Sequence, residues 1–384
     1  MLLHDFEPYP MNESGGTWMR GDPDVAKDLA WAGFDMVSRA NNHAGDYGVD
    51  GMRLTTKYLA AAGLVQAGVG ENLDEAREAK FFESANGRVA LISVASTFPD
   101  HARAGHPRAG VRGRPGLSPL RFTTTYQLPA DRLEALRSLA RELGLRPPAE
   151  GQPLRFLNNR FVAAETAGIH TEPQRQDVEE IATVVRNASR LADRVLVTIH
   201  AHEGMPGNRA MPAEFLVSFA HAMIDAGADV FAGHGPHVVR GVEIYKDKPI
   251  LYSLANFVFE NDLVSRLPAD AFEPMNLGAL AGVADFDDAR SDNDRRSFPA
   301  DREMWESFVA TIRWRGSALD DVTLHPISLG FGEGRTVRGR PRTADAALAK
   351  KIIGDVATRS KPYGTDVVFE NGVGRIVLPR GASQ

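Results

Sequence analysis

Histidines are the residues in this chain best suited to carry chemistry, and five of the eleven fall between residues 199 and 237. His200 and His202 follow one apolar run, and His234 and His237 follow the next in the string Gly-His-Gly-Pro-His. Neutral imidazole, together with carboxylate oxygen, suits Zn, Mn, Fe, Ni or Co. One or two such ions can activate a water molecule for attack on a substrate. The spacing therefore predicts a metal centre.

A third polar cluster, Asn41-Asn42-His43, follows the short segment Met36–Ser38. All three clusters come directly after predicted parallel strands, and open α/β sheets bind ligands at the carboxyl ends of such strands. A single histidine at a strand end is more often satisfied by water or backbone. Three clusters that converge on one edge of a sheet favour a functional site instead.

Other polar side chains are weaker candidates. His221 lies in the middle of a predicted helix between apolar residues, which indicates a core or helix-face histidine. His170 ends an insertion and is a candidate for a lid. Asp46 and Asp50 stand at the start of a helix, where acidic side chains bind free N–H groups, and we expect them to cap that helix.

The elements that must position these residues alternate between helix and short apolar strand. Such alternation indicates βαβ units and a largely parallel sheet. The predicted elements are helix 22–32, strand 34–38, helix 48–62, strand 89–94, helix 174–191, strand 194–199, helix 212–226, strand 229–232, strands 238–244 and 249–252, hairpin 308–313 with 321–327, helix 344–358 and a final strand pair around Gly372.

Two segments interrupt this order within one expected domain, 1–384. An insertion over about 100–172 begins with a basic loop, His101–Arg121, that contains five arginines, and a helix is predicted near 130–143. A second segment, about 262–302, ends in a linker of mixed charge and is expected to be a mobile loop. The fold class is therefore α/β with insertions.

Arginines of the basic loop, among them Arg112 and Arg114, bear on the substrate if the loop lies near the metal centre. Guanidinium groups bind carboxylate and phosphate through two parallel hydrogen bonds. The loop would then suit a polyanionic or carboxylate-bearing substrate. A solvated surface loop is an equally weighted alternative.

Composition excludes several classes of protein. The net charge is 44 − 50 = −6, which argues against a nucleic-acid-coating protein, since that function needs a basic face. The absence of cysteine excludes disulfides, thiolate metal sites and a cysteine nucleophile. No apolar run reaches the length of a membrane span, and the first residues do not form a signal peptide. We therefore expect a soluble, cytoplasmic protein, with cell-surface association only if the N-terminus is truncated.

Ordered motifs give the chain a resemblance to a known family. The string Asn-Asn-His-Ala-Gly-Asp-Tyr-Gly at 41–48 resembles the third motif of the CapA / PgsA capsule-synthesis family, which belongs to the calcineurin-like metallophosphoesterase superfamily. The string Gly227–Val238 is similar to the fifth motif, and 241–245 and 249–257 continue the similarity. The resemblance covers roughly residues 1–97 and 160–260. It implies a metallophosphoesterase-like α/β/β/α sandwich.

The resemblance also implies roles for individual residues. His43 would be the acid that protonates a leaving group or orients the substrate, and His202, which stands where the family commonly has glycine, is the second catalytic candidate. Glu203 and Asn256 join the two arginines as substrate-binding candidates. The implied metal ligands are Glu7, Asn42, His200, His234 and His237.

One departure concerns the first motif of the superfamily, a Gly-Asp pair that ends an initial strand. This pair should precede Glu7, and only six residues do so. We therefore expect the first strand to be missing from this chain. Whether the site binds one metal ion or two therefore stays open.

The implied function is a metal-dependent hydrolase linked to the synthesis or processing of poly-γ-glutamate capsule. Metal-activated water would attack an amide or a phosphoester of an anionic or peptide-like substrate, and capsule-synthesis proteins are the implied partners. Two alternatives stay open: a peptide epimerase that abstracts an α-proton with a histidine base, and a non-catalytic capsule assembly factor.

Overall fold

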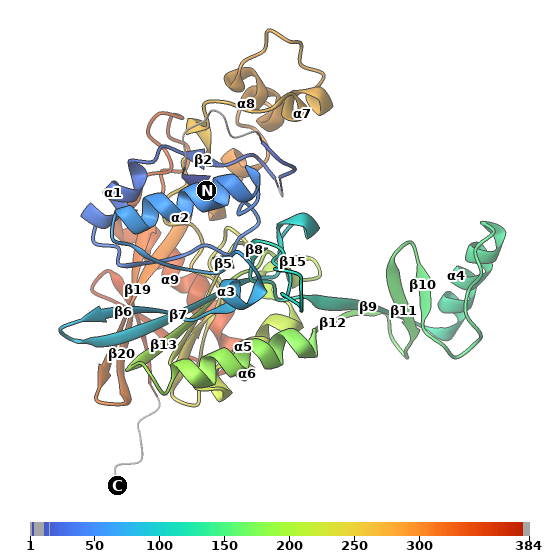
Figure 1. Ribbon diagram of the computed structural model, residues 1–384, viewed down its shortest axis with the longest axis horizontal. Helices are drawn as coiled ribbons and strands as arrows, with labels where there is room; N and C mark the ends of the chain where they lie inside the picture. Colours follow the sequence, from blue (N-terminus) through green and yellow to red (C-terminus); the bar gives the residue numbers. More distant parts are fainter. Residues whose placement is uncertain (1, 4–10, 15, 379–384) are drawn as a thin grey trace.

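A six-stranded mixed sheet lies at the centre of the computed structural model, which describes residues 2–3, 11–14 and 16–378 (Figure 1). Its four inner strands run parallel, and both edge strands are antiparallel to their neighbours. Parallel strands end at the same edge of a sheet, so residues that follow them meet there. The order is β17 (Val242–Tyr245), β18 (Lys248–Leu251), β16 (Val230–His234), β13 (Arg194–His200), β7 (Gly87–Ala95) and β6 (Lys80–Ser84).

Two amphipathic helices, α5 (Arg175–Ala188) and α6 (Glu214–Asp225), cover one face of this sheet. Val197 and Ile199 of β13 are fully buried in the core that these helices form with the sheet. Side chains alternate across a strand, so His200 points to the other face. The register of β13 and β16 places His200 directly beside His234.

The other face of the sheet contributes to a second core, shared with a C-terminal sheet and a long helix. Val242 and Leu251 pack with Phe308 and Leu324 of that sheet and with Ile353 of the helix. The structure is therefore a mixed α/β protein of layered sheets, as expected. These C-terminal elements are β19 (Glu306–Arg315), β20 (Ala318–Ser328), β21 (Arg342–Thr343), α9 (Ala346–Ser360), η6 (Lys361–Tyr363), β22 (Val367–Glu370) and β23 (Val373–Ile376).

The N-terminal part forms small two-stranded units beside the main sheet. Thr55 in its longer helix donates and accepts hydrogen bonds with the backbone of Leu3. Its strand Met36–Ser38 leads into the loop that carries Asn42 and His43. The elements are β1 (Leu2–Leu3), β2 (Arg20–Gly21), α1 (Val25–Trp31), β3 (Met36–Ser38), α2 (Gly48–Ala61), β4 (Val65–Ala67), β5 (Val69–Gly70), α3 (Leu73–Arg77), η1 (Asp100–Ala102) and β8 (Gly116–Leu117).

An arm, residues 122–173, projects from the body (Figure 1). The helix predicted near residues 130–143 is present in the arm as α4 (Ala130–Glu142). The arm also contains a four-stranded sheet that the sequence did not indicate. Phe122 stacks on Phe215 of α6 at a ring-centroid distance of 4.2 Å, which anchors the arm to the body. The strands are β9 (Phe122–Leu128), β10 (Leu154–Phe156), β11 (Asn159–Ala163) and β12 (Gly168–Pro173).

A second projection, which we call the cap (residues 262–302), leaves the body in a different direction from the arm (Figure 1). It contains short helices where the sequence predicted a mobile loop. Arg338 pairs with Asp262 and Asp294, and Arg335 pairs with Asp288. These ion pairs connect residues more than 40 positions apart, which explains why local sequence did not reveal the order. The elements are η2 (Asn261–Leu263), α7 (Ala269–Phe272), η3 (Glu273–Met275), α8 (Val283–Ser291), η4 (Phe298–Ala300) and η5 (Arg302–Trp305).

Asp287 of α8 should make stability depend on pH. Burial and the nearby charge of Asp262 raise its pKa to about 6 from the ordinary value of 3.8. The folded protein therefore holds this proton more tightly than the unfolded chain, and stability falls as pH rises from about 4 to 6. Asp287→Asn should stabilise the protein at pH 7.5 by about 1–3 kcal/mol, since one pKa unit is worth ~1.4 kcal/mol.

Thermal unfolding at pH 7.5 and pH 4.5 measures this effect. The gain from Asp287→Asn should shrink at the lower pH, and the exposed Asp270→Asn in α7 serves as the control. An equal gain at both pH values would contradict the assignment.

Within the described residues, none of the helices combines the length and the apolar character of a membrane span.

Candidate functional site

Four histidines converge where β13 and β16 end. The imidazole rings of His200 and His234 lie 5.1 Å apart between centroids, with their Nδ1 atoms 3.2 Å apart. His202 lies 4.9 Å from His200 and 5.4 Å from His237. The structure thus brings together the three histidines implied as metal ligands and the additional His202.

Burial keeps these imidazoles neutral. It lowers the pKa of His202 and of His234 to about 4, and it lowers the pKa of His200 and His237, with the neighbouring histidines adding to the effect. The Nε2 atoms of His200 and His202 are buried and have no hydrogen-bond partner. Such a nitrogen can bind a cation when the proton of the neutral ring lies on Nδ1.

Asn256 fixes the orientation of His237. The Nδ2 of Asn256 donates to the carbonyl of Met304 at 2.9 Å, so its Oδ1 faces His237 Nδ1 at 2.8 Å. Because an amide oxygen only accepts, His237 carries its proton on Nδ1 and its lone pair on Nε2. Metal-binding histidines commonly have such a partner. Asn256, expected to bind substrate, is thus engaged with His237.

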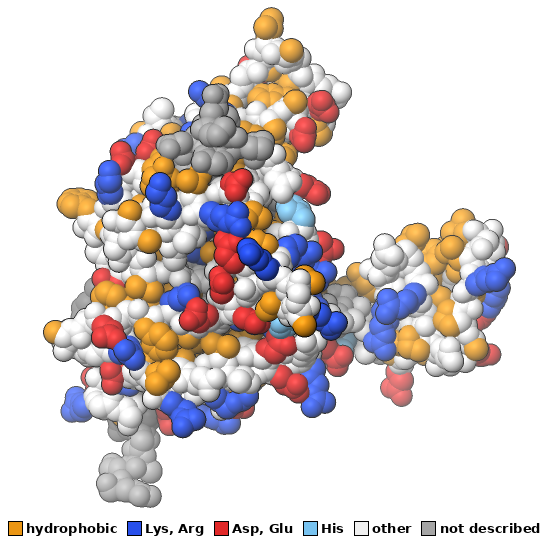
Figure 2. Space-filling view, viewed as in Figure 1, with side chains coloured by type: hydrophobic (Ala, Val, Ile, Leu, Met, Phe, Trp, Pro, Cys, Tyr) orange, Lys and Arg blue, Asp and Glu red, His pale blue; other side chains and the backbone are white. Residues whose placement is uncertain are grey.

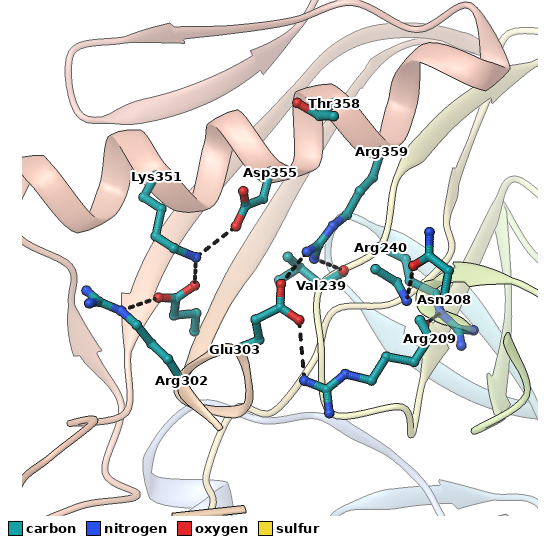
Figure 3. A network of polar contacts seen from close by, with 12 residues as sticks. Asn208, Arg209, Val239, Arg240, Arg302, Glu303, Lys351, Asp355, Thr358 and Arg359 are labelled. Atoms are coloured by element: carbon teal, nitrogen blue, oxygen red, sulfur yellow. Dashed lines mark hydrogen bonds and ion pairs between the residues drawn. The ribbon is translucent and has the colours of Figure 1, made fainter. Parts of the chain in front are cut away.

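A polar network holds the segment that contains Met304 (Figure 3). Glu303 accepts from Arg359 of α9 at 2.5 Å and from Arg209 of β15 at 3.3 Å. β15 (Asn208–Pro212) pairs with β14 (Gly204–Met205) in the hairpin that follows His202. The network therefore connects α9 of the C-terminal layer to the β14–β15 hairpin, which follows His202 in the chain.

Glu203 and Arg240 fix the backbone beside His202. The carboxylate of Glu203 accepts from Ser96 at 2.7 Å and from Thr97 at 2.9 Å. The fully buried Arg240 donates to the carbonyl of Glu203 at 2.8 Å. Glu203, expected to bind substrate, has both carboxylate oxygens engaged within the protein.

Gly235 allows the two strand ends to come close. A Cβ atom at this position would lie 2.9 Å from the backbone nitrogen of Ala201 and 3.0 Å from Cδ2 of His202. Its φ of +119° is also unfavourable for other residues. The glycine between His234 and the following proline is therefore required by the geometry of the site.

His43 forms a dyad with Asp46. Its Nδ1 lies 2.8 Å from Oδ2 of Asp46, which is buried and also accepts from Ser14 and from the backbone of Met19. The expectation that Asp46 caps α2 is wrong, because Tyr47 occupies that position and no side chain caps it. The cause is that the Asp46 carboxylate turns toward the N-terminal segment.

The dyad lies near the cluster. Electrostatic repulsion from His43 contributes to the lowered pKa of His200, His202 and His237. Because Asp46 accepts the Nδ1 proton, Nε2 of His43 carries the lone pair in the neutral form. The dyad thus presents one nitrogen that can take up or release a proton.

The implied ligand set is only partly placed. Asn42 is buried in the same loop as His43, whereas Glu7 lies outside the described residues. Within the described ranges, no group of three or more His, Asp or Glu side chains is arranged to hold a metal ion. The neutral imidazoles and their unpartnered nitrogens fit a divalent cation in donor chemistry, and a carboxylate ligand would come from elsewhere.

The two arginine candidates lie in the exposed part of the basic loop. Arg112 and Arg114 are exposed, and Arg114 Nε donates to the carbonyl of Arg103 at 2.9 Å. In the part of the chain that the structure describes, neither forms a hydrogen bond or an ion pair with the four histidines. Arg121 of the same loop pairs with Asp177 at the base of the arm.

Sequence reasoning missed three residues near the site. Ser38 Oγ lies 3.5 Å from His234 Nε2 and 2.7 Å from Ser93 Oγ. His101 lies against the His43 loop, because a Cβ at Gly45 would be 3.4 Å from its Nε2. A serine inside the apolar run of β7 was a usable signal, and His101 offered none.

The two remaining histidine candidates lie away from the cluster. His221 pairs with Glu243 at 2.9 Å on the helix face, as expected. His170 lies at the base of the arm and pairs with Glu214 at 2.5 Å. Neither takes part in the site.

Comparison with known proteins gives a family. The protein-family model described as "Bacterial capsule synthesis protein PGA_cap" matches residues 7–261 of this chain. The "Uncharacterized protein y4sH" of Sinorhizobium fredii is 34% identical over 98% of this chain and 83% of its own length. The "Capsule biosynthesis protein CapA" of Bacillus anthracis is 28% identical over 68% of this chain and 48% of its own length.

A "Probable polyglutamine synthesis accessory protein" of Mycobacterium tuberculosis is 28% identical over 62% of this chain and 49% of its own length. A solved structure of a hypothetical protein from Thermus thermophilus aligns over 84% of this chain and 89% of that one at 13% identity, with a TM-score of 0.28 that adds nothing to the assignment. The ordered motifs around Asn42, His200 and His234 lie inside the matched range. The chain therefore belongs to the PGA_cap family of bacterial capsule synthesis proteins.

Proposed function

We propose that this protein is a metal-dependent hydrolase that acts in the synthesis or processing of poly-γ-glutamate or a related capsule polymer. The observation that carries the proposal is the cluster of four neutral histidines at the ends of β13 and β16, one of them buried and three half-buried, two of which have an Nε2 atom without a partner. Leaving such polar atoms unpaired costs free energy, which a bound cation would recover.

The ligands of that cation would be His200, His234 and His237, with Asn42 from the neighbouring loop and Glu7 from the N-terminal segment. When bound, a divalent cation polarises a carbonyl or phosphoryl oxygen and makes water a nucleophile near neutral pH. Asn256 would keep the lone pair of His237 Nε2 directed at the site. Binding of one ion or two is compatible with this donor set.

His43 would handle the proton. Asp46 holds its Nδ1 and fixes the orientation of the ring, so Nε2 is the nitrogen that would donate a proton to the leaving group. His202 lies beside His200 and is the second candidate for proton transfer. The preferred bond is a γ-glutamyl amide, and a phosphoester is the alternative substrate of the same machinery.

The substrate class rests on the relatives. Those from Bacillus anthracis and Mycobacterium tuberculosis carry names that refer to capsule biosynthesis and polyglutamine synthesis, and this chain spans about half the length of each. A role beside capsule-synthesis partners is therefore proposed for this chain as well. Its substrate would be an anionic or peptide-like polymer.

Elemental analysis of protein purified without chelators and without an affinity metal tests the proposal. One to two equivalents of Mn, Fe or Zn are expected for the unaltered chain. His234→Ala should lose most of this metal, and His221→Ala, which removes a histidine outside the cluster, should keep it. Absence of metal from the unaltered chain, with no activity on metal addition, would overturn the proposal.

A peptide epimerase is the second candidate, and the buried, unpartnered Nε2 of His202 favours it, since a second base suits proton transfer at an α-carbon. Incubation of a γ-glutamyl oligomer with the metal-loaded protein in D₂O separates the two. Shorter products indicate hydrolysis, whereas deuterium uptake without cleavage indicates epimerisation. A metal-bound protein that does neither would favour a non-catalytic assembly role.

A further inference from the structure

One buried serine interrupts the apolar run of β7. Figure 2 shows charged side chains spread over the face in view, where water solvates them, whereas Ser93 is only 1% exposed. Its neighbours Ile92 and Val94 belong to the core beneath α5 and α6. Side chains alternate across a strand, so Ser93 faces the opposite side of the sheet, as His200 does. A hydroxyl in such a place costs free energy unless it is hydrogen-bonded, so its partners indicate its role.

Ser93 is bonded to the end of β3. Its Oγ lies 2.7 Å from Oγ of Ser38 and accepts from the backbone nitrogen of Ala40 at 3.4 Å. Gly68 leaves space for this hydroxyl, because a Cβ at residue 68 would lie 2.5 Å from Ser93 Oγ and 2.8 Å from the nitrogen of Ala40. Ser38 is therefore held against the main sheet by a hydroxyl that is itself fixed in place.

Ser38 and the histidine cluster contact different nitrogens of His234. Ser38 Oγ lies 3.5 Å from Nε2 of His234, whereas Nδ1 of the same ring lies 3.2 Å from Nδ1 of His200. Histidines that bind metal divide their nitrogens in this way, with one on the ion and the other donating to a fixed acceptor. A separation of 3.5 Å is long for a hydrogen bond, and such bonds in functional sites often tighten only when the ligand binds. The two contacts of His234 therefore correspond to these two roles.

We infer that Ser38, held by Ser93, is a positioning residue for His234. The inference rests on the proposed function, because it directs the lone pair of His234 Nδ1 at the cation site and leaves the ring proton on Nε2. That proton is donated to Ser38 Oγ, and Ser38 donates its own proton in turn to Ser93. Asn256 has the same role for His237, at the other nitrogen of that ring.

Nitrogen-15 NMR of the histidine side chains in the metal-free protein tests the inference, since the two neutral tautomers differ in their nitrogen shifts. The signals of His234 are assigned by their loss in His234→Ala. In the unaltered chain, the proton of His234 should lie mainly on Nε2. Ser38→Ala should lose this preference, and Ser38→Thr, which retains a hydroxyl, should keep it. His221, whose Nε2 is bonded to Glu243, is the internal reference and should not change.

Competition with a chromophoric zinc chelator provides the second measurement. Ser38→Ala should weaken zinc binding by about 10- to 100-fold, the effect typical of removing the partner of a ligating histidine. Ser317→Ala, which changes an exposed serine in the β19–β20 turn, should leave the affinity unchanged. Ser38→Ala combined with Ser93→Ala should weaken binding no further than Ser38→Ala alone, because the two serines act in series.

A proton mainly on Nδ1 of His234, or a zinc affinity that Ser38→Ala leaves unchanged, would overturn the inference. A weaker affinity with an unchanged tautomer would also overturn it, because Ser38 would then only fasten β3 to the main sheet. Absence of zinc binding by the unaltered chain would count against the proposed function instead. The tautomer of His234 in the metal-free protein would still decide the role of Ser38.

Discussion

Replacing Asp177 with alanine should lower the free energy of unfolding by about 3–5 kcal/mol, the cost typical of breaking a buried ion pair on one side. The side chain of Asp177 is completely buried in α5. Its carboxylate accepts from Arg77 of α3 and from the guanidinium and backbone of Arg121, each Arg121 contact being 2.8–2.9 Å long. Three segments of the chain therefore meet on one carboxylate.

The large effect comes from the partner that stays behind. Only 4% of the Arg77 side chain is exposed, and burial lowers its pKa although Asp177 acts in the opposite direction. Without this carboxylate, the guanidinium loses its fully buried partner and keeps only the partly exposed Glu180 and the carbonyl of Pro119. The loop after η1 would also lose the contact of Arg121 that fixes the start of the arm.

The same pair should make the protein sensitive to acid. Burial disfavours ionisation of Asp177, yet the hydrogen bonds from Arg121 and Arg77 outweigh it and hold the pKa of Asp177 below its usual value. Its stabilising contribution is therefore present above the unfolded pKa of about 3.8 and is lost as pH falls through the lower folded pKa.

Urea unfolding at pH 7 provides the measurement. Asp131→Ala, which removes an exposed carboxylate at the start of α4, should change the free energy of unfolding by less than about 0.5 kcal/mol. A loss of under about 1 kcal/mol for Asp177→Ala would show that Glu180 compensates Arg77 on its own and would contradict the argument.

The sequence predicted the main sheet well because buried parallel strands appear as continuous apolar runs. The runs at 89–94 and 194–199 are the cores of β7 and β13. The sheet of the arm escaped notice because its strands are short and polar, as in the threonines of β9, and because β11 pairs in parallel with the distant β9. Local patterns do not encode such pairings.

In the candidate site, too, the sequence predicted some features and not others. Convergence of His200 and His234 followed from two strands ending at one edge, a property that spacing along the chain encodes. The partner of each side chain did not follow. Asp46 resembles a helix cap by position, but its acceptors are satisfied by Ser14, Met19 and His43. Hydrogen-bond partners depend on the placement of distant segments.

Asn256→Ala should weaken metal binding by about 10- to 100-fold, the effect typical of removing the partner of a ligating histidine. The amide accepts the Nδ1 proton of His237 and is itself held by the carbonyl of Met304. Without it, the imidazole can rotate or move its proton to Nε2, which would remove the lone pair from the site.

The conservative variant separates orientation of His237 from general disruption. Asn256→Asp keeps an oxygen that accepts from Nδ1, and a carboxylate accepts more strongly, so this variant should retain most of the affinity. Asn187→Ala, an exposed asparagine of α5, is the matched control. Competition with a chromophoric zinc chelator measures all four proteins. Equal affinity of Asn256→Ala and the unaltered chain would show that His237 does not depend on this amide, and loss in both Asn256 variants would show that the bond to Met304 matters more than the bond to His237.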